Sequence, residues 1–177
     1  RTTKVNSDQF KAYASFNYPE LAESGVDLRI HYNNLLNPSD KNTIFYDSLD
    51  DRISLLKIFP GISEKVVKHN LSDSYSKVLI IESYGSGNVL NSKWFLNEIK
   101  SCIEKGKFII NVSQCPKGSV KMGQYESSTR LVELGIISGK DITIESAICK
   151  SMFLLTKNVN FKTFKEMFEQ SFSGEIS

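Results

Sequence analysis

Apolar residues cluster at intervals along most of the chain in a pattern that predicts strands. Three short, mostly apolar runs, 53–59, 77–83 and 107–113, are each followed by residues that form turns. The run 77–83 is almost continuously apolar at its centre, as is typical of a parallel strand that is buried on both faces. One more short extended piece is expected at 135–139.

Between these runs, apolar residues recur at helical spacing. Ser63 is a suitable N-cap for a helix whose apolar face holds Val66, Val67 and Leu71. Ser92 begins a second, amphipathic helix. It ends in a basic last turn and a C′ glycine, at Lys105-Gly106. Further helices are predicted at 127–134, at 142–155 with Asp141 as cap, and at 161–172.

This alternation of strands and helices predicts an α/β fold, in the form of a small three-layer domain with a parallel, flavodoxin-like sheet flanked by helices. The first part of the chain differs, because residues 17–40 show no sustained period and residues 33–41 are rich in turn formers. The chain opens on a polar segment at Arg1, without Met or an apolar signal segment. We expect residues 1–42 to be the end of a preceding domain plus a linker, and residues 43–177 to form the α/β domain.

Composition and charge narrow the class of protein. The 177 residues are 40% hydrophobic and 11% aromatic, which is enough to build a buried core. The net charge of +2 and the absence of a long basic run argue against a nucleic-acid partner. The apolar runs are far shorter than the ~20 residues of a membrane-spanning helix. Three cysteines without a CxxC pair suggest neither a disulfide framework nor a metal site, and indicate a cytoplasmic setting.

Loops at the carboxyl ends of the predicted strands are the places where a ligand would bind. The segment 84–88 contains two glycines, and is either a tight turn or an approach of the backbone to an anion. Cys115, after the third strand, could be a thiol nucleophile. However, the only histidines are His31 and His69, and neither stands in a motif with it, so a structural or ligand-lining role is favoured.

Other candidate side chains have ordinary structural explanations. Cys102 and Cys149 lie on apolar faces of predicted helices and are expected in the core. Glu126 would help to cap a helix, or could hold a substrate amino group together with nearby hydroxyls. Lys4 lies in a polar tail and is expected to be solvated. These candidate residues do not by themselves indicate which reaction the protein catalyses.

Several blocks, in order along the chain, resemble the C-terminal part of cytoplasmic type I L-asparaginases. They are RTTKV at 1–5, SFNYP at 15–19, LAESG at 21–25, FPGIS at 59–63, SYGSGN at 83–88, NVSQC at 111–115, MGQYE at 122–126 and GKDITIESA at 139–147. The resemblance covers residues 1 to about 155.

The resemblance implies a two-domain amidohydrolase that converts L-asparagine to L-aspartate and ammonia through a threonine acyl-enzyme, without a metal or organic cofactor. In that family the nucleophilic threonines lie in an N-terminal domain, and their glycine-rich motifs do not occur here. The resemblance therefore implies that this chain is inactive alone, requires its own N-terminal domain, and forms a homodimer or a dimer of dimers.

Individual residues match positions of the family. Lys4 matches the catalytic lysine, which hydrogen-bonds the second threonine and helps it to gain or lose a proton. Glu126 and Asn88 match positions that bind substrate in the neighbouring subunit's site.

Some members of the family bind a second asparagine at an allosteric site. Thr3, Asn88 and Cys115 match residues of that site, whereas Glu82 stands where those members have an arginine. A carboxylate at this position would repel the carboxylate of the ligand, so we expect this form of cooperativity to be absent.

Two alternative functions stay open. One is the asparaginase-like subunit of a tRNA-dependent amidotransferase, although the low basic charge of this chain disfavours contact with RNA. The other is a noncatalytic amino-acid-sensing domain that uses the loop 84–88. A sensor should bind asparagine without a further domain, whereas a fragment of an enzyme should not.

Overall fold

The computed structural model describes residues 1–38, 42–123 and 126–177, except for the side chains of residues 126–128. At its centre is a four-stranded sheet in the order β5-β6-β7-β8, with every neighbouring pair parallel. The strands are β5 (Ile53–Lys57), β6 (Val78–Ser83), β7 (Phe108–Ser113) and β8 (Ile137–Ser138). All four predicted strands are therefore present, and the fold is α/β.

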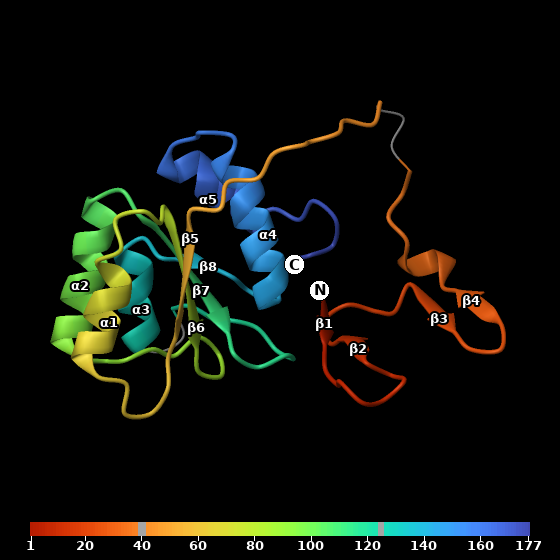
Figure 1. Cartoon of the computed structure of the whole chain (residues 1–177), viewed down its shortest axis with the longest axis horizontal. Helices are drawn as coiled ribbons and strands as arrows, with labels where there is room; N and C mark the ends of the chain where they lie inside the picture. Colours follow the sequence, from red (N-terminus) through yellow and green to blue (C-terminus); the bar gives the residue numbers. More distant parts are fainter. Residues whose placement is uncertain (39–41, 124–125) are drawn as a thin grey trace.

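The order of the strands explains how the helices are distributed. Because each strand adds beside the preceding one and crossovers are right-handed, the three connecting helices should cover the same face. Figure 1 shows this arrangement: α1 (Glu64–Leu71), α2 (Lys93–Glu104) and α3 (Glu126–Glu133) lie on one face. Two later helices, α4 (Ile144–Leu155) and α5 (Phe161–Glu169), cover the other. The result is the predicted three-layer domain.

The core consists of two apolar clusters, one on each face of the sheet. Strand β6 contributes to both, because successive side chains of a strand point to opposite faces. Leu79 and Ile81 join the cluster beneath α1–α3, at whose edge Trp94 packs, and Val78 and Ile80 join the cluster beneath α4 and α5. These four apolar side chains of β6 are fully buried, as the continuous apolar run predicted.

Residues before the sheet form two small antiparallel hairpins. Strand β1 (Thr2–Lys4) pairs with β2 (Tyr13–Ser15), and β3 (Ala22–Ser24) pairs with β4 (Leu28–Ile30). A short 3-10 helix, η1 (Tyr32–Asn34), follows. Figure 1 shows the β1–β2 hairpin on the α4 side of the sheet and the β3–β4 hairpin farther out, both away from α1–α3. Extended chain at 42–52 leads into β5. The expectation of a region without periodic elements at 17–40 missed β3, β4 and η1, because three-residue exposed strands leave no apolar alternation.

Predicted helix starts agree with the structure in part. Ser63 caps α1, since its hydroxyl accepts a hydrogen bond from Val66 N at 3.4 Å. Ser92 stands at the N-cap of α2, but its hydroxyl makes no capping hydrogen bond to the described residues. The expectation that Asp141 caps the next helix was wrong. Helix α4 begins at Ile144, and its cap is Thr143, which accepts from Ser146 N at 3.3 Å.

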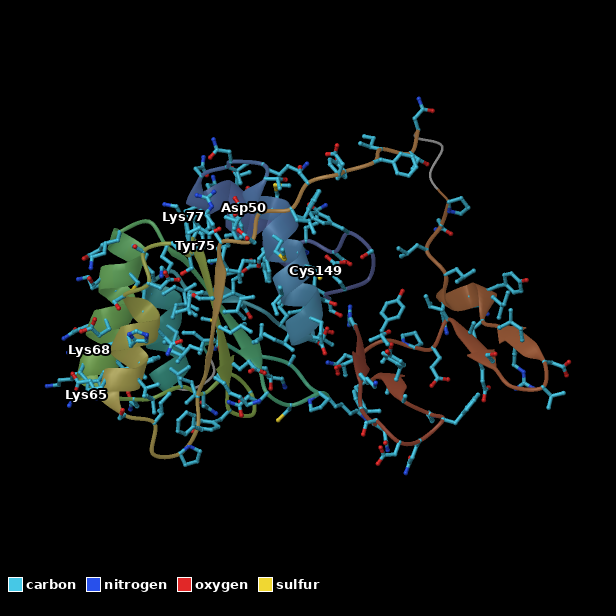
Figure 2. All side chains as sticks on the ribbon, viewed as in Figure 1. Asp50, Lys65, Lys68, Tyr75, Lys77 and Cys149 are labelled. Carbon is cyan, nitrogen blue, oxygen red and sulfur yellow. The ribbon has the colours of Figure 1, made fainter. Side chains whose placement is uncertain are left out.

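Burial corrects two further expectations. Val67 and Leu71 are buried in the core, but Val66 is 44% exposed, because it lies just outside the narrow stripe of α1 that faces the sheet. Cys102 is buried as predicted. Cys149 is exposed on α4 (Figure 2), because the apolar residues of this helix extend around more of its circumference than the sheet covers. Within the described ranges, no helix has the length and apolarity needed to cross a membrane.

Candidate site at the carboxyl edge of the sheet

The carboxyl ends of β5, β6 and β7 are tied together by polar side chains from the end of β7. Gln114 Nε2 donates to Ile58 O at 2.5 Å and to Glu82 O at 2.8 Å. Ser113 Oγ donates to Gly85 O at 2.6 Å. Glu82 O also accepts a hydrogen bond from Ile58 N at 3.0 Å. The bonds from Gln114 and Ser113 therefore join the three strand ends and fix the loop after β6.

The loop after β6, residues 84–88, closes on itself. Tyr84 N donates to Asn88 O and Asn88 N donates to Tyr84 O, both at 2.9 Å. Gly87 has a φ of +106°, and a Cβ there would stand 2.7 Å from Val120 Cγ1, so the position requires glycine. Asn111 Nδ2, which is fully buried, donates to Gly87 O at 2.9 Å. The glycine loop is thus a built turn that holds Asn88 half-buried.

Beside this edge lies a cavity of about 100 Å³ between the ends of β6 and β7, strand β1 and the start of α4. Thr3, Glu82 and Cys115, three of the residues predicted for an allosteric site, line it together. Asn88 is not among its lining residues. The structure therefore brings together three of the four predicted residues from distant parts of the sequence.

Two carboxylates face this cavity and shape its electrostatics. Glu82 is paired with Lys57 Nζ at 3.7 Å, and Glu145 Oε1 accepts a hydrogen bond from Thr3 Oγ1 at 2.6 Å. Sequence reasoning missed Glu145. An acidic residue in the first turn of a helix has an ordinary explanation in the helix dipole, and this masks a contact with a strand far away in sequence.

Strand β1 presents its alternate residues to opposite sides. Thr3 faces Glu145 at the start of α4. Thr2 and Lys4 therefore face the other way, where they stand opposite Ser15 and Tyr13 of β2. Thr2 Oγ1 and Ser15 Oγ are 2.7 Å apart, which confirms this side of the hairpin. Lys4 is exposed, and the structure does not bring it into the cavity.

Arg1 anchors the start of β1. Its Nη1 pairs with Asp141 Oδ2 and donates to Asn17 O at 2.7 Å, its Nε donates to Gly174 O at 2.7 Å, and its Nη2 donates to Ser177 Oγ at 2.8 Å. The side chain is only 4% exposed. No pattern in the sequence indicated this cluster, because its members are separated by up to 176 residues.

One predicted site residue cannot be placed in this geometry. The side chain of Glu126 lies outside the described residues, although its backbone begins α3. In the part of the chain that is described, no group of three or more His, Cys, Asp or Glu residues could hold a metal ion.

Comparison with known proteins finds relatives and solved structures that match all of this chain, and a family model that matches most of it. The family model described as Glutaminase/Asparaginase C-terminal domain matches residues 52–168. L-asparaginase 1 of Escherichia coli K12 is 34% identical over 177 residues, which are all of this chain and 52% of that protein. A glutamyl-tRNA(Gln) amidotransferase subunit of Pyrococcus abyssi is 25% identical, over all of this chain and 40% of that protein.

The crystal structure of L-asparaginase I from Vibrio cholerae superposes with a TM-score of 0.89 at 29% identity, again over all of this chain and 53% of the other. The chain thus spans about half the length, or less, of the curated relatives it matches.

Proposed function

Since the chain belongs to the glutaminase/asparaginase C-terminal domain family, we propose that it is the C-terminal part of an L-asparaginase that hydrolyses L-asparagine to L-aspartate and ammonia. The observation that carries this proposal is the similarity to E. coli L-asparaginase 1 over all 177 residues, including the first 51, which the family model does not reach. Those residues hold β1 and Lys4.

In this proposal the nucleophilic threonines lie in an N-terminal catalytic domain, and Lys4 reaches them from β1. The amine is exposed and faces away from the α/β domain, so a second domain can approach it without moving β1. Contact with that domain would remove water from the amine. Desolvation disfavours the charged form of a lysine and so helps it to exchange a proton with a threonine hydroxyl.

The exposed apolar surface supports a second domain that covers residues 1–49. Most of the large apolar side chains that are exposed in the described part of the chain lie there, including Phe10, Val26 and Phe45, which are at least 90% exposed. Apolar surface of this extent is characteristic of an interface. We propose that residues 1–42 belong to the end of the catalytic domain and a linker, and residues 43–177 to the C-terminal domain.

The remaining assignments follow from the same resemblance. We propose that the enzyme is cytoplasmic, uses no cofactor and forms a homodimer or a dimer of dimers. Asn88 and Glu126 are proposed to contribute to the neighbouring subunit's substrate site. The half-buried position of Asn88 in a closed glycine loop is compatible with an interface residue.

The proposal is tested in the full-length protein by Lys4→Met with ammonia release as readout. We expect kcat to fall by roughly a hundredfold to ten-thousandfold, the usual contribution of proton transfer by a positioned side chain. Lys11→Met is a matched control, because Lys11 is an exposed lysine of the same hairpin. Retained activity in Lys4→Met would remove Lys4 from the mechanism, and asparagine hydrolysis by residues 1–177 alone would contradict the two-domain proposal.

A component of a tRNA-dependent amidotransferase is the second candidate, favoured by the similarity to the Pyrococcus abyssi protein. The two functions differ in what the purified full-length protein does with asparagine. An asparaginase releases ammonia from asparagine without any other component, whereas an amidotransferase component should need its companion protein and a charged tRNA. The net charge of +2 favours the asparaginase.

A further inference from the structure

Strand β1 is held against the start of α4 by its alternate residues. Arg1 pairs with Asp141, two residues before the N-cap of α4, and Thr3 donates to Glu145 in the first turn of that helix. Thr2 and Lys4 face the opposite side. Two polar contacts therefore fix both the position and the rotation of the strand that carries Lys4.

Asp141 is itself fixed by the C-terminal segment. Its Oδ1 accepts from Ser177 N at 2.8 Å and its Oδ2 from Ser177 Oγ at 2.8 Å. Arg1 contacts the same segment through Gly174 O and Ser177 Oγ. Ile176, between them, is buried in the core beneath α4 and α5. The ion pair between Arg1 and Asp141 is thus held in place by a C-terminal segment that is itself anchored in the core.

Stability alone does not explain this pair. Burying a guanidinium and a carboxylate costs solvation free energy, and a well-packed apolar pair would often be as stable. A guanidinium instead supplies several donors in a rigid planar arrangement, which fixes geometry. That geometry is needed here, because a hairpin of two three-residue strands is marginally stable by itself.

We propose that Arg1 and Asp141 are positioning residues for the reaction: their ion pair, closed by Ser177, holds β1 so that Lys4 is presented to the catalytic domain. The inference rests on the proposed function, since it gives Arg1 and Asp141 a role only through Lys4. Lys4 lies about 10 Å along an extended strand from Arg1, at ~3.3 Å per residue, so a shift of the anchored end is transmitted directly to the lysine.

The test uses full-length protein with Arg1→Met, Arg1→Ala and Asp141→Asn, and measures kcat, KM and the unfolding temperature. We expect kcat to fall by roughly tenfold to a hundredfold while KM changes little, because a misplacement of about 1 Å at a reacting group has an effect of this size. Asp141→Asn keeps the shape of the side chain but removes its charge and one of its two hydrogen-bond acceptors, both of which are used. Should the Arg1 variants fail to fold, Asp141→Asn decides the outcome.

A second Arg–Asp pair in the chain provides the matched control. Arg52 Nη2 and Asp50 Oδ2 are 2.6 Å apart just before β5, on a side of the domain away from β1 (Figure 2). Asp50→Asn should leave kcat unchanged even if it lowers the unfolding temperature. Added guanidinium should restore kcat in Arg1→Ala, which a general loss of stability would not permit.

The outcomes separate the inference from the proposed function. If Lys4→Met is inactive and the folded Arg1 and Asp141 variants have kcat within twofold of the unmodified enzyme, the positioning role is overturned and the function stands. If Lys4→Met keeps its activity, the proposed function fails first, whatever the Arg1 variants do.

Discussion

Lys150, in the middle of α4, donates a hydrogen bond to Glu175 in the C-terminal segment across 2.5 Å, and the two side chains are 4% and 11% exposed. Burial by itself raises the pKa of Glu175. The bonds from Lys150 and from the backbone N–H groups of Ser173 and Phe172 outweigh it and lower the pKa from 4.5 to about 2. Burial also lowers the pKa of Lys150.

This pair predicts a specific loss of stability in acid. A carboxyl whose pKa is lower in the folded state stabilises the fold above its unfolded pKa of 4.5, and this contribution disappears as the pH falls through about 2. It amounts to at most about 3 kcal/mol. Glu175→Gln should lose it already at pH 7, and urea unfolding from pH 7 to pH 2 should show a flatter pH dependence.

The matching control is a double variant in which the Lys150 ammonium is removed together with the Glu175 carboxylate. Glu175→Gln leaves Lys150 buried without its partner, whereas Lys150→Met combined with Glu175→Gln removes both charges. We expect the double variant to be more stable than the single one, by about 1–3 kcal/mol. Equal pH dependence of unfolding in Glu175→Gln and the unmodified chain would contradict the lowered pKa.

Lys107 is a second buried charged residue, and we predict that it contributes to stability. Its Nζ donates to Asp73 O at 2.6 Å, Ser76 Oγ at 2.9 Å and Leu71 O at 3.4 Å, at the C-terminal end of α1, where carbonyl groups lack helical partners. Lys107→Met should reduce the free energy of unfolding by about 2–3 kcal/mol, measured by chemical denaturation. Lys65→Met, on the exposed side of α1 (Figure 2), is the control and should change little.

Gly139 predicts a steric limit at the end of β8. A Cβ there would stand 2.7 Å from both Asn111 O and Val112 Cγ1 of the neighbouring strand. Gly139→Ala must therefore push β8 away from β7, and we expect a loss of about 1–3 kcal/mol in thermal unfolding. Gly25→Ala, where a Cβ finds its nearest atom at 4.0 Å, should be neutral. Equal stability of the two variants would show that the strands separate freely.

The cavity beside β1 predicts simple saturation kinetics. Glu82 and Glu145 both face it, and carboxylates there repel the carboxylate of a second asparagine. Under the proposed function, initial rates of the full-length protein against asparagine concentration should therefore fit a Hill coefficient of about 1. A clearly sigmoidal curve would mean that asparagine binds despite this charge.

Sequence patterns predicted the sheet because its central strands, β6 and β7, are buried on both faces, so each leaves a short, nearly continuous apolar run. They missed β1 to β4, since strands of three mostly exposed residues carry no such signal. Cys149 shows the reverse limit: an apolar stretch around most of a helix does not say which side the sheet covers.

The site was predictable only in part, for a related reason. The role proposed for Lys4 came from resemblance, because an exposed lysine in a polar segment has no pattern of its own. Asp141 is a residue type that often caps helices, and it lies just before α4. Its carboxylate is bound by Arg1 and Ser177 instead, and Thr143 caps the helix. Contacts over so long a sequence separation are set by tertiary structure alone.

The placement of Trp94 gives the protein a built-in optical probe. It is the single tryptophan of the chain and packs against the cluster beneath α1–α3, whereas the opposite cluster is rich in phenylalanine, including Phe164 and Phe168. Intrinsic fluorescence therefore monitors one layer, while circular dichroism averages over all three. Coincident denaturation curves from the two signals would show that both layers melt in a single cooperative step.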